Sequence, residues 1–478
     1  MVNTTPKRIL VAYSSSSTYV STTMEYLLSL KKFTKFDVDY VHVTGGAQVN
    51  FDLNEYDVLF HSYCCRLILD DYVSESYKQA LLNFRGLKII SVQDDYDRTA
   101  RLHQELRRLG FHVLITPVPG DFWHLAYPAS ELPGLRIVNA LTGYLPEGLL
   151  DRRPLIVPLD ERRVSVAYRG RNLGPKYGRL GFDKYEIGRR MAELCSARNI
   201  PHDIAMDDAS RIYGTAWFEF LGASRTMLGC ESGSNLFDFD GEFEKTIEQF
   251  EAAQRRKATY EEFEDVTRPI EASFDMGQIS PRAFETAMMM TPMILFRGNY
   301  SGAMEADAHY LPLEKDFSNV DDVLSKVGDT EYLAAMADRA YRHLIRPEKY
   351  GYQAFGRMIE ETIEEEFPKR VDPRWVEFRA RTQLNSNAAV VQGTVVQEMA
   401  TDLPVDAVTL FRNSTQGTTE PGTTELQHNI SAQGGAELRH KTAVPRSERL
   451  AKHYPFAFWA YKWLPTPLRK RVRRHLGI

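Results

Sequence analysis

The sequence predicts an α/β protein built from two Rossmann-like units, and three observations support this. Apolar, strand-like runs alternate with amphipathic helical segments across residues 1–150, which is typical of a parallel sheet covered by helices. The same alternation resumes near Arg163 and continues to His343. A chain of 478 residues is also long enough for two or three domains.

Composition indicates a globular protein of the cytoplasmic compartment. Hydrophobic residues make up 43% of the chain and charged residues 26%, which excludes a disordered or fibrous class. The net charge of -5 gives no basis for nucleic acid binding. The four cysteines show no disulfide framework and no CxxC metal pattern, so we expect a reducing compartment and no metal or cofactor. We find no signal segment and no apolar run long enough to span a membrane.

The first unit, residues 1–150, is predicted to carry the acceptor side of a cleft. Helices are expected at Tyr19–Leu30 and at Thr99–Leu109, with Gly110 in a left-handed conformation at the end of the second. The expected strands are Arg8–Tyr13, Val38–Val43, Val58–His61, Lys88–Val92 and His112–Thr116. In such a sheet a ligand binds where strands end, here at His61–Cys64 and Gln93–Tyr96.

The second unit, residues 151–345, repeats this organisation. Its expected strands are Val164–Tyr168, Arg225–Cys230 and Met293–Phe296, and its expected helices are Asp183–Asn199, Asp321–Val327 and Glu331–His343. The Gly- and Arg-rich stretch Arg169–Gly181, RGRNLGPKYGRLG, is expected to be a loop after the first strand. Two such units in tandem leave a cleft between them.

Three further segments follow. Residues 346–381 are expected to form helices that pack back on the body, and residues 382–446 a flexible linker rich in Thr, Gln, Asn and Gly. Residues 447–478 combine six aromatics in Tyr454–Trp463 with five cations in Arg469–Arg474, which suits an amphipathic helix on an anionic membrane surface. The alternative is a short helix that docks on the protein's own core.

The stretch Ile279–Gly302, ISPRAFETAMMMTPMILFRGNYSG, predicts a binding site for a ribose diphosphate. Ser280 is a candidate N-cap before Pro281, so the first backbone N–H groups point outward as an anion site, to which Arg282 adds a positive charge. Glu285, one turn later, is placed to accept two hydrogen bonds from a vicinal diol such as ribose. The loop Gly298–Gly302, which includes Tyr300 and Ser301, offers further backbone donors.

The loop after the first strand of this unit supplies more cations. Arg169, Arg171, Lys176 and Arg179 are candidates to neutralise a pyrophosphate leaving group without a metal, and the glycines allow close backbone approach. The alternative is a solvated surface loop.

On these residues, the segment Val164–His343 resembles the donor-binding domain of GT-B glycosyltransferases. RAFETAMMMTPMILF stands where that superfamily has its Glu, small residues, a Thr-Pro or Gly-Pro and a strand, and GNYSGAMEADAHYLPL resembles its glycine loop. The resemblance implies that Glu285 binds the ribose, that Arg169, Arg171 and Lys176 meet the phosphates, and that Tyr300–Gly302 line the sugar side. LTGYLPEGL, YRGRNLG and Tyr213–Gly241 also resemble uncharacterised glycosyltransferases of bacterial surface-polysaccharide clusters, so the likeness covers most of residues 8–367.

One position departs from the family pattern. Many retaining GT-B enzymes have a carboxylate eight residues before the ribose-binding Glu, where this chain has Gly277. Either another acid such as Glu231 takes that role or the stereochemistry differs, so retention and inversion both stay open.

An inverting reaction needs a general base on the first unit. The candidates are His61, Asp94, Asp95 and His124, each of which has a structural alternative: a histidine at a strand end often bonds backbone, and an aspartate before a helix often caps it.

Two other patterns are weighed against these. Asp238-Phe239-Asp240 has the DxD spelling of metal-dependent GT-A transferases, but the order of elements around it does not fit that architecture. Met288–Met290 follow helical spacing in an apolar run, which favours core packing over a soft-metal site.

The sequence therefore predicts a glycosyltransferase that moves a sugar from a nucleotide sugar to a glycan or lipid-linked glycan at the cytoplasmic membrane face. The alternatives are a nucleotide-sugar epimerase of similar fold and a catalytically inactive sugar- or nucleotide-binding scaffold.

Overall fold

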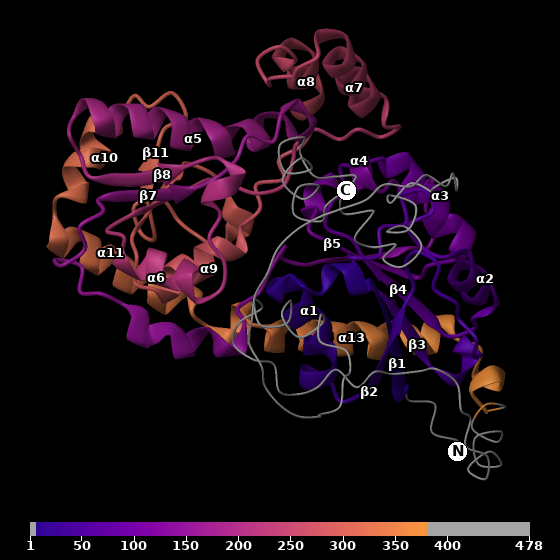
Figure 1. The fold of residues 1–478 in the computed structure, drawn as a ribbon. Coiled ribbons are helices and arrows are strands. Elements are labelled where there is room, and N and C mark those ends of the chain that lie inside the picture. Colours follow the sequence, from indigo (N-terminus) through magenta and orange to yellow (C-terminus); the bar gives the residue numbers. More distant parts are fainter. Residues whose placement is uncertain (1–5, 378, 380–478) are drawn as a thin grey trace, which may run out of the picture. The chain divides into compact units, whose positions relative to one another are not determined.

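The computed structural model describes residues 6–377 and 379 and contains two parallel β-sheets covered by helices (Figure 1). The predicted α/β class with two Rossmann-like units is confirmed. The first sheet has the order β2-β1-β3-β4-β5-β6 with all pairs parallel. Its strands are β1 Arg8–Tyr13, β2 Asp37–His42, β3 Val58–His61, β4 Leu87–Ser91, β5 Val113–Thr116 and β6 Arg136–Asn139.

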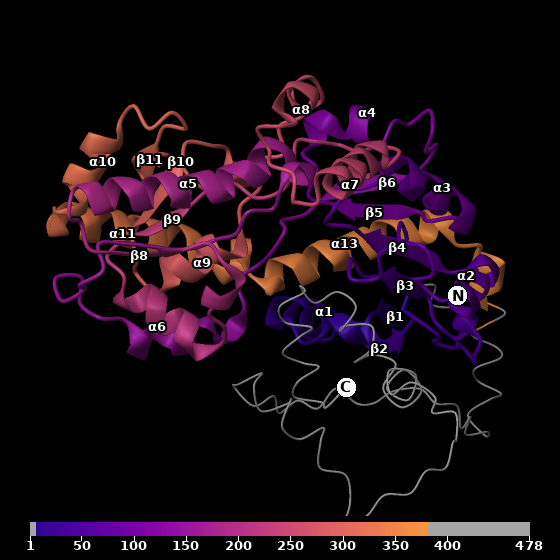
Figure 2. The same cartoon turned by 45° about the horizontal axis from the view of Figure 1, so that its top comes forward.

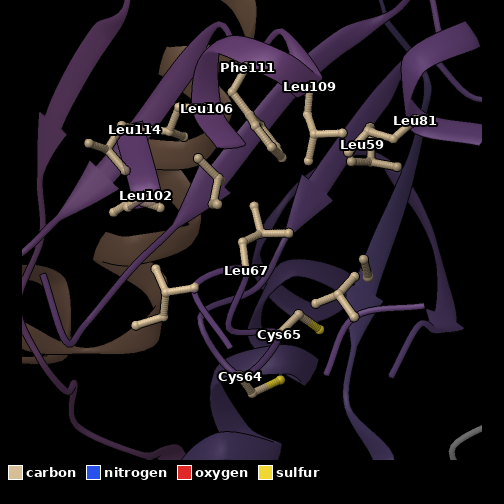
Figure 3. Packing of buried hydrophobic residues seen from close by; sticks show 14 of the residues in the cluster. Leu59, Cys64, Cys65, Leu67, Leu81, Leu102, Leu106, Leu109, Phe111 and Leu114 are labelled. Carbon is tan, nitrogen blue, oxygen red and sulfur yellow. The ribbon is translucent and has the colours of Figure 1, made fainter. Parts of the chain in front are cut away.

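Alternating side chains on the first sheet form two separate cores. Leu10 and Leu59 face the side covered by α2 (Glu75–Asn83) and α3 (Thr99–Leu109), whose packing Figure 3 shows. Ile9 and Phe60 face the other side, covered by α1 (Ser21–Phe33) and α13 (Tyr352–Arg370), as Figure 2 also shows. Successive strand residues point to opposite faces, so both cores follow from near-continuous apolar strands.

The second sheet has the order β11-β10-β9-β7-β8 and is also parallel throughout. Its strands are β7 Val166–Arg169, β8 His202–Ala205, β9 Met227–Gly229, β10 Met293–Phe296 and β11 Leu311–Leu313. The helices that pack with it are α5 Gly178–Ala197, α6 Thr215–Ala223, α9 Pro281–Met288, α10 Val320–Val327 and α11 Thr330–Leu344. The remaining helices are α4 Trp123–Ala126, α7 Glu242–Gln254, α8 Glu264–Glu271 and α12 Pro347–Tyr350.

Both sheets reverse their strand order at one point. In the first sheet the reversal lies between β1 and β3, and in the second between β7 and β9. Loops after these strands diverge to opposite faces and leave a crevice at the carboxyl edge, where α/β proteins bind ligands. This places the loops after β7 and β9 at the predicted ligand edge of the second unit.

The structure differs from the sequence prediction at one important boundary. The stretch Arg169–Gly181 is not a continuous loop, because Pro175–Tyr177 forms a 3₁₀ turn and α5 begins at Gly178. Arg179 therefore lies on a helix. By contrast, α3 spans the predicted residues and Gly110 adopts φ 68° as its left-handed cap.

Helix α13 joins the end of the second unit to the first sheet. Phe355, Ile359 and Ile363 are at most 1% exposed and pack in the core shared with β1 and α1. The Tyr352 hydroxyl donates to the Thr22 carbonyl on α1 at 3.2 Å. The first unit is thus completed by residues from the far end of the described chain.

The predicted linker at 382–446 and the predicted membrane segment at 447–478 lie outside the described residues. Within the described part of the chain, no helix is long and apolar enough to cross a membrane.

We expect Ile359→Ala to destabilise the protein by about 2–5 kcal/mol, because it opens a cavity in a closed core. Chemical denaturation measures the free energy of unfolding. The control is Glu361→Ala, an exposed change on the same helix that should stay within about 0.5 kcal/mol. Equal stability of the two variants would contradict this role for α13.

Candidate active site

A cavity of about 240 Å³ lies where loops of both units meet. Thr22 and Tyr26 of α1 and Asp94 after β4 line it from the first unit, and Ser232 after β9 and Pro281 at the start of α9 from the second. A larger but open depression over Arg297 and Glu314–Asp316 lies at the β11 edge of the second sheet, away from its reversal point. The 240 Å³ cavity is therefore the candidate active site.

Lys184, on the second turn of α5, points toward the carboxyl edge of the second sheet. Its Nζ donates to Ser232 Oγ at 3.3 Å. Its backbone carbonyl accepts a hydrogen bond from the Tyr168 hydroxyl at 2.7 Å. Loss of water lowers the pKa of Lys184, and the nearby Arg282 and Arg171 cations lower it further, while Cys230 and Asp94 act in the opposite direction. No carboxylate lies within 4.0 Å of its ammonium among the described residues.

Arg282 and Glu285 come from the first turns of α9. Ser280 caps this helix by accepting from Arg282 N at 3.4 Å, and Pro281 is its first residue. The Arg282 guanidinium lies 5.2 Å from the Trp217 ring centroid and 5.6 Å from that of Tyr168, and in the described chain no carboxylate pairs with it within 4.0 Å. Two cations, Lys184 and Arg282, thus act on each other, and neither has a carboxylate within 4.0 Å among the described residues.

The Glu285 carboxylate is held by a single side chain. Trp217 Nε1 donates to Glu285 Oε2 at 2.8 Å. Burial raises the pKa of Glu285, whereas the Trp217 hydrogen bond and the Arg282 charge lower it. The other oxygen, Oε1, accepts no hydrogen bond from the described residues.

The glycine loop after β10 is already occupied by a protein carboxylate. Glu231 Oε1 accepts from Asn299 N at 2.5 Å and Tyr300 N at 3.3 Å. Ser301 N donates to the Gly277 carbonyl at 2.7 Å, and Gly302 N to Asn299 Oδ1 at 2.8 Å. The expectation that Tyr300, Ser301 and Gly302 offer free backbone donors to a diphosphate is therefore corrected, because the protein itself uses these N–H groups.

Glu231 fills the space that a side chain at Gly277 would need. A Cβ built on Gly277 would come within 2.5 Å of Glu231 Oε1, and one on Gly298 within 2.6 Å of both Glu231 oxygens. Burial raises the pKa of Glu231, and the two backbone donors and Lys315 oppose that shift. The Glu231 carboxylate therefore fills the space that a side chain at Gly277 would occupy.

Three cations of the predicted phosphate loop are used within the protein. Arg169 pairs with Asp203 at 2.8 Å, donates to the Ser210 carbonyl and lies 4.3 Å from the Phe220 ring centroid. Lys176 pairs with Glu244. Arg179 pairs with Asp183 at 2.8 Å on the same helix.

Arg171 differs from those three, because it is exposed and acts electrostatically on Lys184. Arg171 and Arg282 are thus the predicted cations that stay without a carboxylate partner within 4.0 Å in the described chain, and Lys184, which was not predicted, lies near both.

The two aspartates of the DxD tripeptide cap the N-terminus of helix α7. Asp238 Oδ2 accepts from Glu244 N at 2.9 Å and Oδ1 from Phe243 N at 3.2 Å, while Asp240 Oδ1 accepts from Glu242 N at 3.1 Å. Both carboxylates therefore satisfy the first N–H groups of α7. Across the described residues, no group of His, Cys, Asp and Glu is arranged to hold a metal ion.

The two neighbouring aspartates have different environments. Asp94 lines the cavity, accepts from the Tyr96 hydroxyl at 2.9 Å and lies 3.7 Å from Arg66. Asp95 is fully buried and accepts from Thr116 and Tyr127, and its burial raises its pKa to about 6. Only Asp94 is placed to meet a substrate, and Asp95 is corrected to a structural role.

His61 is likewise a structural residue. Its Nε2 is 2.6 Å from the Cys65 carbonyl, to which it donates, so Nδ1 accepts from the Tyr77 hydroxyl at 3.0 Å. Burial lowers the pKa of His61 to about 4. His124 is exposed on α4 and does not line the cavity. Neither histidine is brought to the site.

Met288 and Met289 are fully buried in the cores beneath α9, which confirms their predicted packing role.

The predictions from sequence missed Lys184 and Trp217. Lys184 lies on a helix that was predicted, but helical periodicity shows which face is apolar and not which polar side chain turns toward a sheet edge. The one available signal was position, since Lys184 follows the first strand of its unit by a single loop.

Comparisons with known proteins give structural likenesses only. No family model matches the chain, and no curated protein matches it. HepE of Anabaena, crystallised with UDP and glucose, is 12% identical over 75% of this chain and 100% of its own, with a TM-score of 0.38. An α1,3-fucosyltransferase is 9% identical over 78% of this chain and 94% of its own, with a TM-score of 0.41.

AviGT4, a glycosyltransferase of avilamycin A biosynthesis, is 10% identical over 74% of this chain and 98% of its own, with a TM-score of 0.32. Identities this low, with TM-scores below 0.5, leave the assignment of function to the residues of the site.

We expect the stability of the protein to fall as the pH drops from about 6.5 to 4. The folded state holds His61 neutral, whereas the unfolded chain takes up a proton near pH 6.5, so up to about 3 kcal/mol is lost across that window. Denaturation curves of His61→Gln should lack this share of the pH dependence, although other buried groups such as His112 still contribute. An identical pH slope in wild type and variant would contradict the buried, neutral histidine.

Proposed function

We propose that the protein is a glycosyltransferase that uses a nucleoside-diphosphate sugar as donor and needs no metal ion. The observation that carries this proposal is the pair Lys184 and Arg282, two cations with no carboxylate within 4.0 Å among the described residues, near the carboxylate of Glu285 at the reversal point of the second sheet. A ligand with two negative charges joined to a diol matches this arrangement.

The diphosphate binds between Lys184 and Arg282, with Arg171 at the solvent side. Unpaired cations in a partly dehydrated site attract an anion strongly, because the effective dielectric constant there is low. Ser232, which already accepts from Lys184, offers a hydroxyl to a phosphate oxygen. These charges stabilise the nucleoside diphosphate when it leaves.

The ribose binds to Glu285. Trp217 fixes Oε2, so Oε1 faces the ligand and accepts from a ribose hydroxyl. Arg282, three residues earlier on the same helix, links the two halves of the donor because it lies beside both the ribose carboxylate and the phosphates.

The transferred sugar lies near Glu231. Its carboxylate fills the space of a side chain at Gly277, so it supplies the acid that many retaining GT-B enzymes have at this position. Glu231 is fixed by Asn299 and Tyr300, and one of its oxygens remains for a sugar hydroxyl. This arrangement favours an active transferase over an inactive scaffold.

For an inverting displacement, Asp94 is the general base. It faces Ser232 and Pro281 across the cavity and acts electrostatically on Lys184. The acceptor hydroxyl gives its proton to Asp94, its oxygen forms the new bond to the anomeric carbon, and the bond from that carbon to the diphosphate breaks. The leaving diphosphate keeps the electron pair.

The acceptor, a glycan or lipid-linked glycan, and the cytoplasmic membrane face rest on the sequence alone. The aromatic and basic residues of 447–478, outside the described part of the chain, would hold the cavity near an acceptor in an anionic membrane.

We expect Lys184→Gln and Glu285→Gln each to lower kcat/KM by about 10²–10³, because each removes a preorganised contact to the donor. Transfer is measured as nucleotide release with each candidate donor and a glycan acceptor. Lys326→Gln, a surface lysine of α10, is the control and should keep full activity. Full activity of both site variants would contradict the proposal. Epimerisation of the donor without nucleotide release would also contradict it.

Transfer activity should survive treatment with EDTA followed by gel filtration. Asp238 and Asp240 cap α7 and are not needed for a cation, while Lys184 and Arg282 supply the positive charge. Loss of activity that Mg²⁺ or Mn²⁺ restores would show that a metal takes part.

A further inference from the structure

Five tyrosines line the first unit's side of the 240 Å³ cavity, and each comes from a different segment of the chain. They are Tyr26 of α1, Tyr63 after β3, Tyr96 after β4, Tyr144 after β6 and Tyr352 at the start of α13. Aromatic walls with a few polar groups between them are typical of small-molecule sites.

The rings are parts of the packed core under α13. The ring centroids of Tyr26 and Tyr63 are 4.8 Å apart, and those of Tyr144 and Tyr352 are 5.6 Å apart. Phe355 of α13 joins the two pairs, because its ring centroid lies 4.9 Å from that of Tyr26 and 5.1 Å from that of Tyr144. The walls of the cavity are therefore held by the same core that supports the first sheet.

Hydrogen bonds within the protein also fix the tyrosines. The hydroxyls of four of the five are bonded: Tyr63 donates to Thr23 Oγ1 at 3.1 Å, Tyr96 to Asp94 Oδ1 at 2.9 Å and Tyr352 to the Thr22 carbonyl at 3.2 Å, while Tyr144 accepts from Leu141 N at 3.1 Å. A ring that is packed on its side and bonded at its tip presents a fixed apolar face to a ligand.

The polar groups between the rings are mainly hydrogen-bond acceptors. Gln93 Nε2 donates to the Thr142 carbonyl at 3.1 Å, and its Oε1 accepts no hydrogen bond from the described residues. Asp94 Oδ1 accepts from Tyr96, whereas no described residue donates a hydrogen bond to its Oδ2. A ligand that supplies hydroxyl protons satisfies both oxygens, and a ligand group without protons satisfies neither.

The charge of the lining disfavours an anion. Within the described part of the chain, the residues that line the cavity include no lysine, arginine or histidine, and Asp94 is their one charged side chain. Two cations lie just behind the lining: Arg66 is 3.7 Å from Asp94, and Lys184 contacts Ser232 and is proposed to meet the phosphates of the donor. An acceptor anion would therefore face a carboxylate without a cation of its own.

The cavity has room for about one sugar ring. An apolar cavity of roughly 150 Å³ holds one benzene molecule, which has six carbon atoms. In proportion, 240 Å³ holds about ten non-hydrogen atoms, close to the size of one pyranose with its hydroxyls.

We propose that the acceptor ends in an uncharged pyranose, which binds with its C–H face against the tyrosine rings and its hydroxyls toward Asp94 and Gln93. This inference rests on the proposed transferase and names the chemical class of its acceptor. The C–H groups on one face of a pyranose are apolar and slightly positive, so they pack on the negative faces of aromatic rings. A terminal uronic acid or a bare lipid phosphate does not fit this lining.

The test is a saturation-transfer NMR titration of the full-length protein at pH 7. The ligands are the methyl and octyl glycosides of glucose, galactose and mannose, the methyl glycosides of the matching uronic acids, and octyl phosphate. We expect at least one neutral glycoside to bind, and its uronic acid counterpart to bind at least about 10-fold more weakly. Tighter binding of the octyl form would identify a lipid-linked sugar as the acceptor, and equal binding the end of a glycan.

Two variants test the aromatic wall and the charge separately. Tyr63→Leu removes one ring face and should weaken binding of the neutral glycoside about 10-fold. The matched control is Tyr332→Leu on α11, a tyrosine outside the cavity, which should keep the wild-type affinity. Gln93→Lys places a cation in the cavity and should strengthen binding of the uronic acid glycoside about 10-fold, a gain that a misfolded protein would not show.

The outcomes separate this inference from the transferase proposal. Tighter or equal binding of the uronic acid glycosides or of octyl phosphate in wild type overturns the inference, and so does the absence of binding by every neutral glycoside. Either result leaves the transferase proposal standing where nucleotide is released with another acceptor. Selective binding of a neutral glycoside without transfer from any nucleotide sugar supports the pyranose site and contradicts the transferase.

Discussion

The proposed donor site depends on charge that the protein does not pair within 4.0 Å. Lys184 and Arg282 have no carboxylate at that distance among the described residues, and Glu285 has one neutral donor, Trp217, instead of an ion pair. Burial disfavours the charged forms of Lys184 and Glu285. Such an arrangement raises the energy of the empty site, and a ligand of complementary charge relieves it.

Glu231 shows the opposite arrangement within the same sheet edge. Here a buried carboxylate is satisfied by Asn299 N and Tyr300 N, and glycine at 277 and 298 makes room for it. A larger residue at either position would collide with the carboxylate, and at Gly277 the φ of +24° also favours glycine. The Glu231 carboxylate, which follows β9, is thus held by the loop whose space it fills.

Much of the fold could be predicted from the sequence, but much less of the site. Buried parallel strands are continuous apolar runs, so β1, β3 and β10 were found with their observed bounds, and Gly110 marked the end of α3. Short or half-exposed strands such as β6 carry no such signal. At the site, Arg169 and Lys184 are both basic residues near β7. Only the fold shows that Asp203 neutralises the first, while no carboxylate of the described residues lies within 4.0 Å of the second.

The cavity is built from both units, and this has a consequence for where specificity resides. In the proposed function, Lys184, Glu285 and Glu231 of the second unit meet the phosphates, the ribose and the sugar, whereas Thr22, Tyr26 and Asp94, which line the cavity, belong to the first unit. Helix α13 completes the core under α1, the helix that carries Thr22 and Tyr26. A change in the packing of α13 would therefore alter the first unit's side of the cavity while leaving the second sheet's cations in place. In the proposed function, the contacts to the donor and the first unit's side of the cavity are thus carried by different parts of the fold, so the second could change without loss of the proposed diphosphate site.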